Sequence, residues 1–75
     1  MAYWEITVPT VTADSRSGVQ VFTYPAERFP AKDLAQSQAR LDVDSADAIR
    51  HRRGASAVPD AIRTVWHASR ITSQF

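Results

Sequence analysis

The residues that could do chemistry gather near the C-terminal end of the sequence and are mostly basic. They are Arg50, His51, Arg52, Arg53, Arg63, His67 and Arg70. Guanidinium and imidazolium groups bind phosphates and carboxylates, so these side chains could contact nucleic-acid backbone or an acidic protein. Residues 50–75 hold five arginines against the single acid Asp60, a formal charge of +4, whereas residues 1–49 carry a formal charge of −3. This asymmetry favours a charged partner.

Spacing divides the basic residues into a run and a stripe. Successive helix residues lie about 100° apart, so residues 50–53 would encircle a helix end, where cations also interact favourably with the helix dipole. Arg63, His67 and Arg70 are spaced by four and three residues and would share one helix face. Each group is open to two interpretations, a solvated structural surface or a contact with phosphate or acidic protein. A close turn between the two helices would merge run and stripe into one basic surface.

Other chemistries find little support in the sequence. Asp42, Asp44 and Asp47 resemble a calcium loop in composition only, because Asp47 stands at the sixth position, which needs glycine, and helix capping accounts for these carboxylates. The two histidines belong to no metal-ligand motif, no serine lies in a nucleophile-elbow context, and two glycines cannot build a phosphate-binding loop. We therefore expect a protein that is not an enzyme, with no cofactor and no metal site.

The elements that must position these residues begin with a β-hairpin. Residues 3–12 alternate apolar and polar side chains, which predicts a half-buried strand, and Pro9 indicates an edge strand or a bend. Gly18 can adopt positive φ and is expected to close the hairpin. Residues 19–24 predict a second strand with large side chains on both faces. If no helix covers its second face, Phe22 and Tyr24 become an interface to a twin subunit or a target.

Three short helices are expected after the hairpin. The first spans about residues 31–41, and the shallow stripe expected to lie against the sheet consists of Leu34, Gln38 and Leu41 with Ala35 and Ala39 beside them. The second begins at an Asp44 cap and is stopped at Arg53 by Gly54. The third begins at Pro59 and includes Arg70. Its apolar face is formed by Ile62, Val65, Trp66 and Ser69, with Trp66 as the anchor in the core.

The expected fold is therefore α+β, an N-terminal β-hairpin followed by three short helices packed on one face of the sheet, in a single small domain of residues 1–75. A chain this short buries only roughly 60–65% of its unfolded surface. It has no cysteine, so self-association is the remaining common source of stability, and a third strand could come from Ile71, Ser73 and Phe75 or from a second copy.

These features predict a non-catalytic small binding protein that occupies a surface of a protein partner. Homodimerisation and nucleic-acid backbone binding through residues 50–70 are the further partner hypotheses. Small size and opposed charge halves are also typical of accessory or inhibitory proteins of phages and mobile elements. We expect a cytoplasmic location and no membrane contact, because the sequence lacks cysteine, a basic N-terminal region followed by a long apolar run, and any stretch near the roughly 20 apolar residues that span a bilayer.

Overall fold

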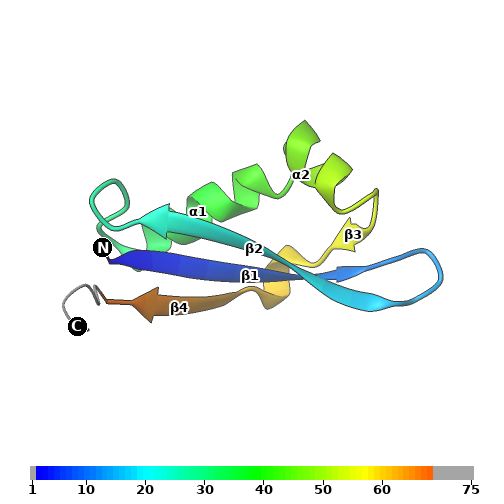
Figure 1. The fold of residues 1–75 in the computed structure, drawn as a ribbon, viewed down its shortest axis with the longest axis horizontal. Coiled ribbons are helices and arrows are strands. Elements are labelled where there is room, and N and C mark those ends of the chain that lie inside the picture. The colour runs from blue at the N-terminus through cyan, green and yellow to red at the C-terminus, as the bar shows by residue number, and fades with distance from the viewer. Residues whose placement is uncertain (1, 69–75) are drawn as a thin grey trace, which may run out of the picture.

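The computed structural model describes residues 2–68 of the chain, and within them it has an α+β fold with an antiparallel sheet of four strands (Figure 1). The elements in order are β1 (Tyr3–Val11), β2 (Ser17–Pro25), α1 (Lys32–Asp42), α2 (Ala46–His51), β3 (Ser56–Ala57), the 3-10 turn η1 (Pro59–Ala61) and β4 (Arg63–His67). The expected hairpin and the first two helices are confirmed.

Strand β1 is the centre of the sheet, not the edge that Pro9 suggested. It pairs with β2 along one side in an unbroken register from Tyr3↔Pro25 to Val11↔Ser17, without a bulge. Its other side pairs first with β4 and then with β3. Pro9 lies between those two partners, and its carbonyl accepts a hydrogen bond from the Val58 N–H at 2.9 Å. The proline is tolerated because its missing donor coincides with the change of partner strand.

The two faces of the sheet differ in what covers them. The covered face consists of the even-numbered residues of β1 and β2 together with Thr64 and Trp66. Both helices lie along the same side of the hairpin (Figure 1), and beneath them Ile6 and Val8 are fully buried. The open face consists of the odd-numbered residues of β1 and β2 together with Arg63, Val65 and His67. Within residues 2–68 no helix covers it.

Helix α1 contacts the sheet through its small residues. Ala35 and Ala39 are buried in the core with Ile6 and Val8, whereas Leu34 is 50% and Leu41 is 69% exposed. The expectation that the two leucines face the sheet is therefore wrong. Alanine lets the helix backbone approach the strands closely, and the rings of Tyr24 and Phe29, whose centroids are 5.1 Å apart, contribute the bulk at this interface.

The third expected helix is also wrong. Residues Pro59–Ala61 form a single 3-10 turn, and Arg63–His67 form strand β4, which pairs with Tyr3–Thr7. Thr64 and Val65 are β-branched, and the pairing gives β1 a second hydrogen-bonded neighbour, which an isolated helix cannot supply. Trp66 packs on Trp4 with ring centroids 4.5 Å apart, yet it stays 48% exposed and is no core anchor.

Two residues, Gly18 and Asp44, do not have the roles predicted for them at the hairpin turn and at the start of α2. Ser15, with φ of 68°, supplies the left-handed residue of the hairpin turn, and Gly18 lies inside β2 opposite Thr10. The cap of α2 is Ser45 rather than Asp44, because the Ser45 hydroxyl accepts the Ala48 N–H at 3.2 Å. The residues expected at the end of the third helix and in a C-terminal strand, Ser69, Arg70, Ile71, Ser73 and Phe75, lie outside the described residues.

The hydrophobic core is small for the length of the chain. Its only large side chains that are fully buried are those of Ile6, Val8 and Val43 among residues 2–68. The radius of gyration is 13.8 Å, whereas a compact chain of this length has about 11 Å. The elongated shape leaves much apolar surface in contact with solvent, so a partner that covers part of it would add stability.

Candidate interaction surface

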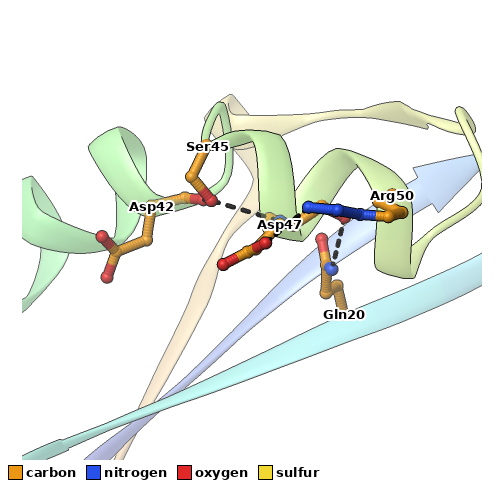
Figure 2. A network of polar contacts seen from close by, with 6 residues as sticks. Gln20, Asp42, Ser45, Asp47 and Arg50 are labelled. Carbon is orange, nitrogen blue, oxygen red and sulfur yellow. Dashed lines mark hydrogen bonds and ion pairs between the residues drawn. The ribbon is translucent and has the colours of Figure 1, made fainter.

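Helix α2 (Ala46–His51) holds the first two residues of the predicted basic run, Arg50 and His51, and is fixed by polar contacts (Figure 2). Ser45 caps its first turn and donates a hydrogen bond to the Asp42 carbonyl at 2.7 Å. Asp47 and Arg50, three residues apart, form an ion pair of 2.6 Å on the solvent side. Both side chains are largely exposed, so the pair adds little stability. Arg50 thus has its own carboxylate and does not project as an unpaired cation.

Arg52 is turned inward, unlike the rest of the run. Its Nη1 donates to the Val43 carbonyl at 2.6 Å and to Gln20 Oε1 at 3.2 Å, and its Nε donates to the Ala55 carbonyl at 2.7 Å. The guanidinium therefore joins the α1–α2 connection, the segment after α2 and the sheet. This arrangement satisfies buried polar groups and makes Arg52 a structural residue.

Gln20 completes this network from the covered face of β2. It is buried, and its Nε2 donates to the Ala48 carbonyl at 3.0 Å while its Oε1 accepts from Arg52 (Figure 2 shows the contact with α2). An amide with both ends paired fixes the position of α2 above the strand. The sequence pattern alone does not predict this role. A glutamine in an alternating strand is equally compatible with the solvent-exposed face.

Beside this network lies an open groove of about 930 Å3. One wall is the outer part of β2 from Ser17 to Phe22, and the other is α2 with Asp47, Ala48 and His51. Six consecutive residues of one strand line it, so both faces and the backbone edge of β2 border the groove. Its lining combines apolar and polar groups of both charge signs.

The remaining residues of the run are exposed at the end of α2. His51 is exposed, and Arg53 adopts left-handed backbone with φ of 54°, followed by Gly54 with φ of 78°. The Gly54 N–H donates to the Ile49 carbonyl at 3.0 Å, which terminates the helix in a left-handed C-cap. The helix itself ends at His51, two residues before the expected stop. Cations at this end also complement the helix dipole.

The predicted stripe is not helical where the structure describes it, because Arg63 and His67 belong to β4, and its third member, Arg70, lies outside the described residues. Arg63 and His67 lie on the open face, opposite Thr7 and Tyr3 of β1. The His67 Nε2 lies 2.7 Å from Glu5 Oε1, and its ring stacks on Tyr3 with centroids 4.7 Å apart and an interplanar angle of 11°. Helix α2 is on the covered face, so the run lies on the opposite side of the sheet from Arg63 and His67.

The predicted aromatic interface residues are on the covered face. Tyr24 is buried and Phe22 is partly buried against the core. The Tyr24 hydroxyl donates to Asp42 Oδ2 at 2.7 Å. Burial raises the pKa of the Tyr24 phenol well above its ordinary value, and the hydrogen bond to the Asp42 carboxylate and its charge raise it further. These rings stabilise the α1–sheet contact.

Sequence reasoning gave no interface role to the valines of the open face. Val19 is 64%, Val21 48%, Val65 40% and Val11 38% exposed, and all four lie on this face. The alternation of β2 could have revealed them, since it separates Val19 and Val21 from the aromatic residues. Exposed valines grouped on one face of a sheet indicate an interaction surface more directly than scattered ones do.

Among residues 2–68, no group of three or more His, Asp and Glu side chains could hold a metal ion. In the same part of the chain, no helix is both long and apolar enough to cross a membrane. Comparison of the chain with models of protein families, with curated proteins and with solved structures gives no match. Function must therefore be inferred from the surfaces themselves.

Proposed function

We propose that this chain is a non-catalytic binding protein whose open face docks on the surface of a protein partner. The observation that carries the proposal is the group of exposed valines at positions 11, 19, 21 and 65 on one uncovered sheet face. Their burial on binding would be favourable by roughly 25 cal/mol per Å2 of apolar surface. Such a patch is the apolar centre that protein interfaces share.

Charged groups at the margin of this face indicate the partner's chemistry. Arg63 is exposed beside Val65, whereas Glu5 is already paired with His67 at 2.7 Å. The side chain of Arg63 can therefore meet a carboxylate at the rim of the partner, where charge complementarity favours the correct orientation. The proposed partner is a protein with an apolar patch bordered by acidic residues.

The hypothesis that residues 50–70 bind nucleic-acid backbone has weaker support. His51 and Arg53 are exposed at the end of α2, but Arg52 contacts protein carbonyls and Arg63 lies across the sheet. A phosphate backbone would meet only part of the predicted set. A role as an accessory or inhibitory protein of a phage or mobile element belongs to the same proposal, since such proteins act by covering a surface.

The experiment is quantitative affinity capture with paired variants. Val19→Lys and Val65→Lys place a charge on the open face, and Ile49→Lys is the matched control because Ile49 is 42% exposed on α2. We expect the unmodified chain and Ile49→Lys to retain one protein in stoichiometric amount, and both open-face variants to lose it. Circular dichroism checks that all variants fold. Equal retention by all of them, or retention of nucleic acid instead, would contradict the proposal.

A further inference from the structure

We propose that two copies of this chain associate through the outer edge of β2, so that two β2 strands pair antiparallel around a two-fold axis. This edge is distinct from the open face, and the inference does not rest on the proposed function. It follows from four observations on β2: the direction of its backbone N–H and C=O groups, its amino-acid composition, the groove beside it, and the residue pairs that a two-fold axis would bring together.

The backbone groups that point out of the sheet can be assigned from β1. The Pro9 carbonyl points toward the β3 side, where it accepts from Val58, so the pair Pro9↔Val19 exchanges no hydrogen bonds between β1 and β2. The N–H and C=O groups of Val19 therefore point away from β1. With a period of two, those of Val21 and Thr23 point the same way, and the residues in between pair with β1.

Strand β2 has none of the features that usually protect a sheet edge. Its sequence Ser17–Pro25 contains no charged residue, and its one proline is the last residue. Its register with β1 is continuous over all nine pairs, so no bulge twists the edge away. A long, uncharged edge with free hydrogen-bonding groups is a template for another strand. In the described residues only β1 pairs with β2.

A groove lies beside part of this edge. The groove of about 930 Å3 runs between the Ser17–Phe22 part of β2 and helix α2. Strands in a sheet lie about 4.8 Å apart, so a strand added to β2 would occupy the part of this groove nearest the edge.

Pairing with the same strand of a second copy is favourable for β2 and unfavourable for β4, the strand at the other edge of the sheet. A two-fold axis at Val21 places Val19 opposite Thr23 of the second copy and repeats the contact by symmetry, with no like charges opposed. The same operation on β4, centred at Val65, would place Arg63 opposite His67, two basic groups. Pairing of β2 with β4 would be heterologous and would produce rings or open chains of molecules in place of a two-fold dimer.

Dimerisation by this edge would also help the small core. The pairing joins two four-stranded sheets, and it places Val19 and Val21 of both copies side by side on one continuous open face. The radius of gyration and the few buried residues show that the single chain leaves apolar surface uncovered. The dimer would present a larger apolar patch to a third protein.

The test separates the contribution of an outward backbone N–H group from that of the side chain at the same position. Val21→Pro removes the outward N–H of Val21 but no bond to β1, and Val21→Thr is the matched control because it keeps the N–H and the β-branched shape. By light scattering at high micromolar concentration, we expect the unmodified chain and Val21→Thr at twice the monomer mass of 8.3 kDa. Val21→Pro is expected at the monomer mass.

Amide hydrogen exchange of the unmodified chain makes the test independent of folding of the proline variant. The amides of Val19, Val21 and Thr23 should become at least tenfold more protected as the concentration rises through the dimerisation range. A monomer at all concentrations would overturn the inference. A dimer in which these three amides stay unprotected, or one that Val65→Lys dissociates and Val21→Pro does not, would place the interface on the open face and also overturn it. Partner capture by a monomeric Val21→Pro chain would show that the proposed function stands without the dimer.

Discussion

The covered face and the open face of the sheet both carry β-branched apolar side chains, but these are buried on the covered face and exposed to solvent on the open face. Ile6 and Val8 are buried beneath α1, whereas Val19 and Val21 are in contact with solvent. Both groups arise from the alternation of adjacent strands, so the strands alone do not decide which face forms the core. The apolar residues of the covered face account for stability, and those of the open face have no partner within residues 2–68. This apolar surface is therefore the one to which we assign the proposed binding function.

The largest expected effect that separates the two faces is the truncation of a buried residue. Ile6→Ala should lower the free energy of unfolding by about 3 kcal/mol, because it removes buried methyl groups and leaves a cavity in a small core. Val19→Ala should change it by less than about 0.5 kcal/mol. Urea denaturation followed by circular dichroism, at a concentration where the chain is monomeric, measures both. Equal losses would show that the open face is packed like the covered one.

The next largest effect concerns the polar network on the covered face. Arg52→Ala should cost about 2 kcal/mol, because three hydrogen bonds to a charged group are lost and buried Gln20 loses a partner. Arg50→Ala is the control, and loss of its exposed pair with Asp47 should cost less than about 0.5 kcal/mol. The comparison is made by thermal unfolding. Similar costs for the two variants would mean that Arg52 is not held in the network.

A smaller effect is expected at the buried phenol of the covered face. Tyr24→Phe removes the hydrogen bond to Asp42 and should cost about 1 kcal/mol at neutral pH. Because the folded state raises the pKa of Tyr24 above its ordinary 10.0, the phenol keeps its proton more tightly when folded. Its contribution is complete below about pH 10 and is lost as the pH rises above it. Unfolding measured between pH 8 and 11 should show a shallower alkaline decline for Tyr24→Phe, and parallel curves would argue against the buried contact.

The smallest effect on stability is expected on the open face. Val65→Thr preserves the β-branched shape on a partly exposed strand and should change the free energy of unfolding by less than about 0.5 kcal/mol. The same substitution should weaken capture of the protein partner, since it places a hydroxyl in the apolar patch. The two measurements together sharpen the difference between the faces. A stability loss above 1 kcal/mol with unchanged capture would reverse the assigned roles.

The hairpin and the first two helices could be predicted from the sequence because their signals are local. Residues 3–12 and 19–24 have period-two alternation, and Gly54 follows the second helix in a left-handed conformation. The third helix was mispredicted because Ile62, Val65 and Trp66 are spaced for a helix, while β-branched residues at 64 and 65 also suit a strand. The helical placement of the basic stripe was mispredicted for the same reason, since it depended on that helix.

By itself the sequence determined the α+β class and the opposed charges of its two halves. Its alternation also determined that Val19 and Val21 lie on one face of the hairpin and that Phe22 and Tyr24 lie on the other. Only the tertiary structure decided which of these two faces is buried, that Arg52 faces inward, and that residues 63–67 complete the sheet. The physical reason is that β1 has two edges to satisfy. Residues 56–67 supply partners for the second edge, at sequence separations from 45 (Val11↔Ser56) to 64 (Tyr3↔His67), and no local periodicity encodes such a long-range pairing.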